Sequence, residues 1–398
     1  MKKVPLGKLI KFIRGITFTP QELVIPYSEG AVACLRTKNI QTDLDLSDII
    51  AVPHSLVKRE EQFVQVNDML ISSANSFELV GKTVFVPELD FQATAGGFIS
   101  IVRPLQRVIY PRYLFNWLMS PLTQLKIRYC GRKTTNISNL DREQFLNLEI
   151  PLPALDEQRH IADILDTVDS IRRSRQEALE QIDALIKSQF IEMFGDPVTN
   201  PKGWDVKRLA ELIKVRSSKR VYQREQATYG VPFLRVSDLT NKIINGGNSC
   251  ELYISEDLYE SFLKRDLVPQ PGDILVTSRG TLGLCYIVNE SDRFYFQDGM
   301  ISWLDNRKGK IDSVYLSFLF HNDEIGRQIE QVSAGSTVRY LSLGNLENLK
   351  VLIPPISLQN EFAAFVEQAD KSKFAMQQQL QEIETLKAAL MQQYFSQQ

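Results

Sequence analysis

The sequence contains one unit twice, and this repeat restricts the possible folds more than any other feature. IPLPALDEQRHIADIL at 150–165 aligns with VLIPPISLQNEFAAFV at 351–366, an offset of 201 residues. Upstream segments align in the same order, with offsets between 199 and 205: Leu35-Arg36 with Leu234-Arg235, VNDMLIS (66–72) with PGDILVT (271–277), GGFISIV (96–102) with DGMISWL (298–304), Tyr113 with Tyr315, and Gly131 and Ile137 with Gly335 and Leu341. Because chance similarity would scatter the offsets, we infer an internal duplication.

Each half begins with a mixed α/β part. Runs such as DMLISS, KTVFV, GFISIV and DILVT are rich in β-branched and aromatic residues and are bounded by Gly, Asn, Asp or Pro, which predicts short strands. The segments 111–129 and 312–332 have the apolar spacing of helices. The sequence therefore predicts a mixed α/β domain in each half.

Each half ends in a long helical segment with a coiled-coil pattern. A 4-then-3 spacing selects ten positions in each segment, of which seven are apolar in the first and eight in the second. The seam includes Ile161, Leu165, Val168, Leu179, Ile182 and Ile186 in the first helix, and Phe362, Val366, Met376, Leu380, Ile383 and Leu390 in the second. Both helices have a basic residue at the same step, Arg172 and Lys373. We expect the helices to pair, although each could instead pack only on its own domain.

The length of the predicted seam suggests a role for the helices. Each seam spans 33 residues, about 50 Å at the usual rise. If the helices pair antiparallel, the two α/β domains are related by a pseudo-two-fold axis. Dimeric DNA-binding proteins place two modules about 34 Å apart, one turn of the duplex. The helices are thus long enough to hold two DNA-binding domains at a fixed spacing.

The composition fits an ordinary globular chain with a locally basic surface. Among 398 residues, 43% are hydrophobic and the formal net charge is −2. The net charge is +4 over 1–152 and +1 over 201–355, but −5 over 153–200 and −2 over 356–398. Nucleic-acid binding needs local positive charge rather than a basic whole chain, so the charge is compatible with binding DNA as well as with ordinary surface variation.

Several classes of protein are excluded by missing motifs. The four cysteines form no C-x-x-C pair, no apolar run approaches 18 residues, and the N-terminus lacks an apolar signal segment. We therefore expect a cytoplasmic protein without a membrane span or a disulfide framework. Phosphate-binding glycine loops, amino-methyltransferase motifs and H-E-x-x-H are absent, and His54, His160 and His321 are isolated. These absences favour a binding protein without catalytic residues or a bound metal.

Four strings in order on this duplicated frame resemble the DNA-specificity subunits of type I restriction-modification systems. They are IPLPALDEQRHIADILDTVD (150–169), FGDPVTNPKGW (194–204), LVTSRGTLG (275–283) and SAGSTVRYLSLGNLENLKVLIPP (333–355). The resemblance covers essentially the whole chain. It implies target-recognition domains at 1–152 and 198–355, and long spacer helices at 153–197 and 356–398 that pack as an antiparallel coiled coil. The second helix begins ISLQN where the first has LDEQ, a partial departure from the family pattern.

The resemblance also implies a function and partners. Each recognition domain is expected to read one half of a bipartite, asymmetric site in double-stranded DNA. Two adenine methyltransferase subunits and motor-nuclease subunits are the expected partners, and S-adenosylmethionine, ATP and Mg²⁺ belong to them, so this chain binds no cofactor. Alternatives that remain open are a methylation-only or phage-defence system and, in a different class, a coiled-coil scaffold that binds proteins.

Candidate DNA-binding residues lie in loops with the right side-chain chemistry. Phosphate contacts use Lys, Arg and small hydroxyl residues, and base contacts use Arg, Lys, Asn or Gln. The candidates in the first domain are Arg36, Lys38, Asn39, Arg132, Lys133, Thr134 and Asn136. Those in the second are Arg235, Ser237, Arg279, Thr281, Ser336, Thr337 and Arg339.

Overall fold

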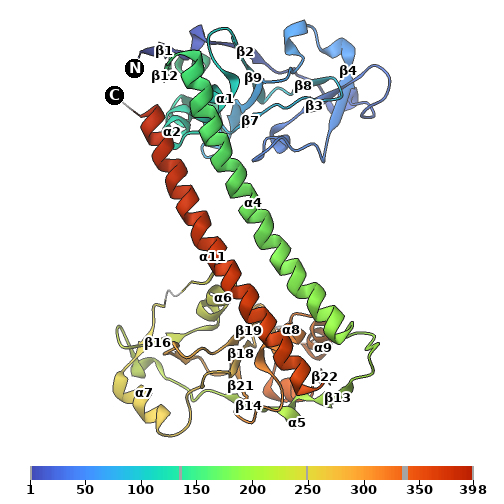
Figure 1. The fold of residues 1–398 in the computed structure, drawn as a ribbon, viewed down its shortest axis with the longest axis vertical. Coiled ribbons are helices and arrows are strands. Elements are labelled where there is room, and N and C mark those ends of the chain that lie inside the picture. Colours follow the sequence, from blue (N-terminus) through green and yellow to red (C-terminus); the bar gives the residue numbers. More distant parts are fainter. Residues whose placement is uncertain (1, 134–136, 248–249, 334–338, 397–398) are drawn as a thin grey trace. The chain divides into compact units, whose positions relative to one another are not determined.

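The fold consists of two compact units that share two long helices. A computed structural model describes residues 2–133, 137–247, 250–333 and 339–396, without the side chains of 132, 133 and 333. Unit 1 comprises Met1–Glu177 and Gln377–Gln398, and unit 2 comprises Ala178–Met376. The long helices α4 (Leu155–Phe194) and α11 (Ile356–Phe395) each have 40 residues and belong partly to both units (Figure 1). Within the described residues, no helix is long and apolar enough to cross a membrane.

The α/β part of unit 1, from β1 to β12, is called domain 1. Its main sheet has the order β2-β9-β5-β7, and a second sheet has the order β4-β3-β8 with β3 and β8 parallel. The remaining strands form the sheet β10-β11-β6 and the pair β1-β12. The strands are β1 (Lys3–Pro5), β2 (Ile10–Arg14), β3 (Ala31–Leu35), β4 (Ile50–Pro53), β5 (Met69–Ser72), β6 (Ala74–Asn75), β7 (Thr83–Phe85), β8 (Ala93–Ala95), β9 (Ile99–Pro104), β10 (Gly131–Lys133), β11 (Ser138–Leu140) and β12 (Glu149–Pro151). The helices are η1 (Leu6–Lys8), η2 (Pro20–Glu22), η3 (Thr37–Asn39), η4 (His54–Leu56), η5 (Glu60–Gln62), α1 (Pro111–Met119), α2 (Pro121–Tyr129) and α3 (Arg142–Leu146).

The α/β part of unit 2, from β13 to β22, is called domain 2 and repeats the main sheet, the parallel strand pair of the second sheet and the pair of terminal strands. Its main sheet is β14-β21-β18-β19, its second sheet is β15-β17-β16-β20 with β16 and β20 parallel, and β13 pairs with β22. The strands are β13 (Asp205–Arg208), β14 (Lys214–Ser217), β15 (Gln226–Ala227), β16 (Val231–Leu234), β17 (Tyr253–Ile254), β18 (Ile274–Thr277), β19 (Cys285–Ile287), β20 (Tyr295–Phe296), β21 (Ile301–Asp305) and β22 (Lys350–Ile353). The helices are α5 (Leu209–Leu212), η6 (Gln223–Glu225), α6 (Val236–Asn245), α7 (Glu256–Leu263), α8 (Ser313–Phe320), α9 (Asp323–Ser333) and α10 (Leu343–Glu347).

Each main sheet is buried on both faces. In domain 1, Met69 and Ile71 of β5 face the helix α1, whereas Leu70 between them packs with Leu35 of the second sheet. In domain 2, Leu275 of β18 likewise packs with the second sheet, and its neighbours face α8. Because successive side chains of a strand point to opposite faces, both faces need apolar residues, which accounts for the continuous runs DMLIS and DILVT.

Each segment predicted as a single helix forms two. Pro121 favours an extended conformation at the residue before it, and Ser120 has ψ 140° between α1 and α2. In the second half, α8 ends at Phe320 and α9 begins at Asp323. The break in both halves separates a helix that packs on the main sheet from a helix that leads to a loop.

One residue match in the repeat was wrong. The N–H of Leu140 donates to the carbonyl of Ser73 at 2.8 Å, and the N–H of Leu341 donates to that of Ser278 at 3.0 Å. Leu341 therefore corresponds to Leu140 rather than to Ile137, which is 46% exposed. The sequence match failed because it assumed the spacing from Gly131 was kept; Gly335 lies outside the described residues.

The end of each long helix packs in the domain of the other half. Phe395, at the end of α11, lies 5.4 Å from the ring of Tyr113 in unit 1. Phe194, at the end of α4, lies 4.7 Å from Tyr315 in unit 2. The first turns of the partner helix join the same cores, through Ile161 in unit 1 and Phe362 in unit 2. Within each unit the two helices are therefore antiparallel.

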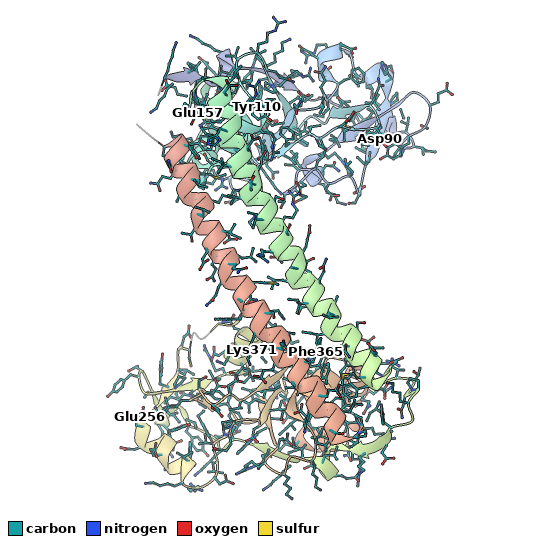
Figure 2. The ribbon with its side chains drawn as sticks, in the orientation of Figure 1. Asp90, Tyr110, Glu157, Glu256, Phe365 and Lys371 are labelled. Carbon is teal, nitrogen blue, oxygen red and sulfur yellow. The ribbon has the colours of Figure 1, made fainter. Side chains whose placement is uncertain are left out.

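The entry into each long helix depends on a buried glutamine. Gln158 is 1% exposed; its Oε1 accepts the N–H of Tyr110 at 2.8 Å, and its Nε2 donates to the carbonyl of Pro153. Gln359 makes the matching pair of bonds, with the N–H of Asp312 and the carbonyl of Pro354. Figure 2 labels Tyr110 beside the first turn of α4. The second helix thus keeps the glutamine contact although its entry sequence departs from LDEQ.

All twenty positions of the predicted seam are buried or half-buried. Ion pairs join the two helices within each unit: Lys387 Nζ with Asp169 in unit 1, and Lys373 Nζ with Asp183 at 2.7 Å in unit 2. Arg172 is half-buried and lies 3.8 Å from Asp169. At Arg172, Lys373 and Lys387 the seam therefore has charged side chains that lie beside carboxylates, in place of an apolar contact.

Candidate nucleic-acid interface

Three loops meet at one end of the sheets in each domain. The strand-end loop follows β3 (residues 36–48) or β16 (235–247). The tip loop follows β5 (73–80) or β18 (278–282), and the helix-exit loop lies between α2 and α3 (130–141) or between α9 and α10 (334–342), of which the structure describes 130–133, 137–141 and 339–342. The residue ranges of these loops include all fourteen residues predicted to bind DNA.

The same backbone hydrogen bonds hold the loops in both domains. In domain 1, Gly96 N–H donates to Leu35 O at 2.9 Å and Ser73 N–H donates to Phe98 O at 2.9 Å. In domain 2 the equivalent bonds run from Gln297 to Leu234 at 2.9 Å and from Ser278 to Met300 at 2.8 Å. Together with the bonds from Leu140 and Leu341, they join the ends of both sheets to the helix-exit loop. The frame is repeated although the side chains on it differ.

A glycine after each tip loop approaches the second helix closely. Gly81 has φ +85°, and a Cβ there would lie 2.4 Å from Ile127 Cγ2 of α2. Gly283 has φ +80°, and a Cβ there would lie 2.8 Å from Ile329 Cδ1 of α9. Both the backbone conformation and the lack of space require glycine at these positions. The tip loop is thereby held against the helix that precedes the helix-exit loop.

The strand-end loop of domain 1 has a network of its own. Arg36 and Lys38 both pair with Asp48, and the side chain of Lys38 is 61% exposed. Asn39 is 1% exposed, accepts the N–H of Arg36 at 2.7 Å and donates to the carbonyls of Asp45 and Asp48. These bonds occupy the Asn39 amide inside its own loop, so Asn39 shapes the loop and is left out of the set of residues that we propose to contact bases.

The strand-end loop of domain 2 is a helix instead of a short turn. Arg235 donates to Asp238 and to Glu251, and these two carboxylates hold its pKa above the usual range of arginine. Ser237 is exposed in the first turn of α6. The charged guanidinium of Arg235, paired with these two carboxylates, thus supports the start of α6. Ser237 presents its hydroxyl to solvent.

The tip loop of domain 2 presents an arginine. Thr277 closes the loop: its N–H donates to Leu284 O and its Oγ1 accepts the N–H of Leu284, both at 3.0 Å. Arg279 and Thr281 are exposed on this short loop. The guanidinium of Arg279 lies 5.5 Å from the ring of Tyr340, beside exposed Arg339. Arg279, Thr281 and Arg339 are therefore brought to the same end of domain 2.

Some predicted residues have no described side chain. Arg132 and Lys133 belong to β10, opposite Asn139 and Ser138 of β11. Thr134, Asn136, Ser336 and Thr337 lie outside the described residues.

Buried charges support the interface differently in the two domains. Asp68 and Asp273 occupy the same position, are each 1% exposed, and accept the N–H three residues earlier at 2.8 Å. Burial raises the pKa of both carboxyls. Asp68 binds the guanidinium of Arg103 in β9, whereas Asp273 binds the indole N–H of Trp303 in β21 at 2.9 Å.

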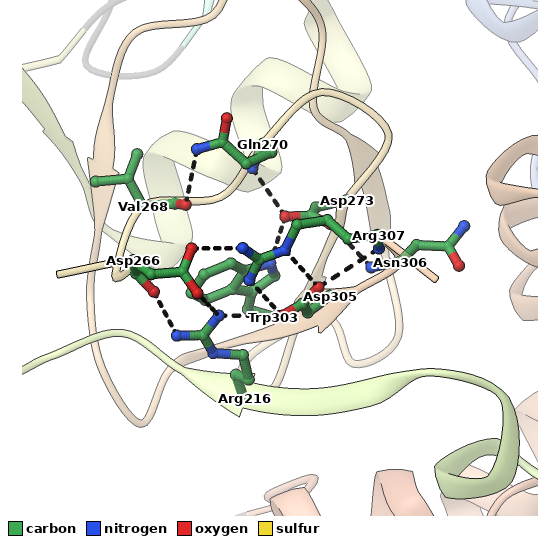
Figure 3. Close-up of polar contacts among 9 residues, drawn as sticks. All are labelled: Arg216, Asp266, Val268, Gln270, Asp273, Trp303, Asp305, Asn306 and Arg307. Carbon is green, nitrogen blue, oxygen red and sulfur yellow. Dashed lines mark hydrogen bonds and ion pairs between the residues drawn. The ribbon is translucent and has the colours of Figure 1, made fainter. Parts of the chain in front are cut away.

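The position equivalent to Arg103 is Asp305, the centre of a network in domain 2 (Figure 3). Hydrogen bonds from Arg307 lower the pKa of Asp305 to about 2, and Arg216 Nη1 also donates to it at 3.0 Å. Both arginines pair with Asp266 in the loop after α7, and Arg216 lies 3.9 Å from the ring centroid of Trp303. The network ties that loop to the main sheet.

Sequence reasoning missed three contributors to the loops. Lys82 donates to Gln41 at 2.8 Å and links the end of the tip loop to the strand-end loop of domain 1. Tyr340 supports Arg279, and Phe98, after two glycines, is 65% exposed. An aromatic residue directly after Gly96-Gly97 was a usable signal for Phe98. Among the described residues, no group of three or more His, Cys, Asp or Glu could hold a metal ion.

The sequence matches a known family twice. The family described as type I restriction modification DNA specificity domain matches residues 3–183 and again 201–385. The StySPI specificity subunit of Salmonella potsdam is 27% identical over 385 residues, covering 92% of this chain and 81% of that protein. The EcoKI specificity subunit of Escherichia coli K12 is 26% identical with the same coverage, and the MjaVIII specificity subunit of Methanocaldococcus jannaschii is 24% identical over 98% of this chain and 90% of that protein.

Solved structures show the same fold. A type I restriction-modification S subunit from M. genitalium superposes with a TM-score of 0.61 at 15% identity, covering 100% of this chain and 96% of that one. A chain from a study of type I restriction-modification complex assembly superposes with a TM-score of 0.57 at 18% identity, covering 99% and 97%.

Proposed function

Because the chain belongs to the type I restriction modification DNA specificity family, we propose that it selects the DNA sequence on which a type I restriction-modification complex acts. The observation that carries the proposal is the doubled frame. Two domains hold three loops with the same backbone bonds, while the loop side chains differ. A constant frame with variable side chains is what reading two unrelated sequences requires, since base contacts specify and backbone contacts position.

We propose that each domain reads one half of a bipartite, asymmetric site. The two tip loops differ in length and chemistry: 73–80 has eight residues without a basic side chain, whereas 278–282 has five including Arg279. Two identical readers would favour a palindrome, and two different ones favour an asymmetric site. The long helices, each of 40 residues, are proposed to set the length of the unread spacer.

In this proposal the chain recognises DNA and leaves catalysis to its partners. Two adenine methyltransferase subunits modify the site, and motor-nuclease subunits cleave DNA that lacks the modification. S-adenosylmethionine, ATP and Mg²⁺ are expected in those subunits. The absence of nucleotide-binding and methyltransferase motifs from the sequence supports this division of labour.

The proposed contacts in domain 2 are testable by a matched pair of arginines. Arg279→Ala combined with Arg339→Ala should weaken specific binding, each base contact being worth about 1–3 kcal/mol. Arg224 is the control, since it is also exposed and lies 5.4 Å from a tyrosine ring, Tyr222, but precedes β16 instead of following it. Unchanged affinity of the double variant in the assembled complex would remove these residues from the interface.

Methylome sequencing of the host with and without the gene tests the function as a whole. We expect the deletion to abolish one bipartite methyl-adenine motif. Loss of a continuous palindrome would contradict the two-reader arrangement. If no motif is lost and the assembled complex shows no salt-dependent duplex binding, the result favours a protein-binding scaffold instead. Phage challenge of the same strains separates a restricting system from a methylation-only one.

A further inference from the structure

Domain 1 exposes large apolar side chains around the sheet β10-β11-β6. Leu79 is 46% exposed, Phe98 65%, Tyr129 70% and Ile137 46%. These four residues, called the apolar patch, come from the tip loop, the turn between β8 and β9, the end of α2 and the helix-exit loop. Clustered exposed apolar side chains on a soluble protein usually mark a binding surface.

The backbone under Phe98 is held in place. Phe98 lies in the turn that Ile99 N–H closes onto Gly96 O at 2.9 Å, and its carbonyl accepts the N–H groups of Ser73 and Ala74 at 2.9 and 3.3 Å. Ala74 pairs with Asn139 of β11. The Phe98 side chain is thus exposed on a backbone bonded to the edge strand of the small sheet, which gives it a fixed position at low entropic cost on binding.

The other aromatic residue of the patch is supported from the tip loop. The ring of Tyr129 packs edge-on against Phe77 at 5.9 Å between centroids. Tyr129 precedes β10, whose Arg132 and Lys133 are basic, and Lys82 follows the tip loop. Basic residues therefore flank the patch in the sequence, alongside the acidic Glu78 of the tip loop, and positive charge beside the patch suits the phosphates of nucleic acid.

Among the described residues of domain 2, a methionine and not an aromatic residue occupies the position of Phe98. The residue whose carbonyl accepts the N–H of Ser278 is Met300, which is only partly exposed. Its tip loop offers Arg279 and Thr281 instead. At this backbone position domain 1 therefore exposes an aromatic ring and domain 2 has a partly exposed methionine, while the arginine of domain 2 comes from its tip loop.

We propose that Phe98 reads a thymine by packing on its C5-methyl group in the major groove. The thymine methyl is the apolar group that base edges offer in that groove, and Phe is among the side chains that contact it. The tip loop of domain 1 has no arginine or lysine to bind guanine, and its one asparagine, Asn75, hydrogen-bonds locally to Ser72 and Ser76. The exposed Phe98 beside this loop therefore favours an apolar contact. This inference rests on the proposed function and adds that the half-site read by domain 1 includes a thymine recognised by its methyl group.

Deoxyuridine gives a test that removes only the methyl group. The full chain, assembled with its methyltransferase partner, is titrated with duplexes containing the motif found by methylome sequencing, and each thymine of both halves is replaced in turn by deoxyuridine. One replacement in one half should weaken binding about fourfold, the value of one buried methyl group. Phe98→Ala should weaken binding to the thymine duplex roughly tenfold and should bind the two duplexes equally.

Matched variants separate this contact from other roles of the patch. Phe98→Leu keeps an apolar side chain and should retain part of the discrimination between thymine and uracil. Ile25→Ala is the control, since Ile25 is 78% exposed and lies before β3, away from the loops that follow it. If Phe98→Ala weakens binding to thymine and uracil duplexes by the same factor, the residue acts as a wedge or a protein contact and the inference is wrong. If no thymine responds while the motif itself is confirmed, the inference fails and the proposed function stands.

Discussion

Domains 1 and 2 share their backbone frame and differ most where charge is buried beneath it. Asp68 and Asp273 are equally buried and make the same bond to the N–H three residues earlier. The strand that crosses them carries Arg103 in domain 1 and Asp305 in domain 2, a reversal of charge at one position. Domain 2 compensates with Arg216 and Arg307.

The comparison indicates which parts of each domain are free to change. The loop-holding bonds use backbone N–H and carbonyl groups, so they do not depend on side-chain identity. The charged clusters depend on side chains, but each is satisfied within its own domain. Variation in the loops and in the clusters therefore leaves the frame intact, as a protein that must read new sequences requires.

The largest expected loss of stability concerns the ends of the two long helices, which pack differently in the two units. Phe194 is fully buried among Phe190, Tyr315 and Phe362, whereas Phe395 is 8% exposed and meets Tyr113. We expect Phe194→Ala to destabilise unit 2 by about 4 kcal/mol and Phe395→Ala to destabilise unit 1 by about 2 kcal/mol. Hydrogen exchange of peptides from each unit across a urea series measures both. Equal losses of stability in the two units would contradict this prediction and show that the two helix ends are packed alike.

The next largest loss of stability should follow replacement of the buried glutamine at the start of each long helix, and it should be equal in the two units. Gln158→Leu removes the acceptor of the Tyr110 N–H and the donor to Pro153 O. Two buried groups lose their partners, at a cost of about 3 kcal/mol, and Gln359→Leu should cost the same in unit 2. Gln368→Leu, on the exposed face of α11, is the control with no expected loss. A cost in only one unit would refute the view that this glutamine is the shared entry to both helices.

The repeat made much of the fold predictable. The offset near 201 and the seam spacing were enough to predict two mixed α/β domains and two long helices, because periodic apolar positions and duplicated order are written directly in the sequence. The match between Ile137 and Leu341 failed because a loop that changes length keeps no fixed spacing. The helix break at Ser120 was missed because the apolar spacing continues across it, although Pro121 disfavours a helical residue before it and suits the first turn of a new helix.

The interface was only partly predictable. Exposed arginines on glycine-bounded turns, such as Arg279, follow from residue type and turn signals. Asn39 does not, since an Asn that bonds its own loop and an Asn that contacts a base look alike in sequence. Phe98 was missed although Gly96-Gly97 before it signals a turn, because the adjoining run FISIV was interpreted only as a buried strand.

Replacing Asp305 should cause a smaller loss of stability, and this loss is specific to domain 2. Asp305→Asn removes one of the two carboxylates that Arg216 and Arg307 share, the other being Asp266, and should destabilise unit 2 by about 2 kcal/mol near neutral pH. Because the pKa of Asp305 is about 2 in the fold and 3.8 ordinarily, its stabilising effect is complete above about pH 4 and is lost as the pH falls toward 2. Urea unfolding of both proteins between pH 7 and 3 measures this convergence. A gap that stayed constant, or one as large for the exposed Glu290→Gln, would rule out the charge of Asp305 as its cause.

The smallest effect distinguishes the two tip-loop glycines. Gly81→Ala and Gly283→Ala both force a positive φ on alanine, but the clashing atoms differ: Cγ2 of Ile127 and Cδ1 of Ile329. Valine retains Cγ2 and lacks Cδ1. Ile329→Val should therefore recover about 1 kcal/mol of the stability lost in Gly283→Ala, whereas Ile127→Val should recover none of the loss in Gly81→Ala. Two double-mutant cycles on urea unfolding measure the coupling, and equal coupling would mean that the loops adjust to the helices in the same way. Unequal coupling would show that the two domains reach one backbone frame through different side-chain contacts.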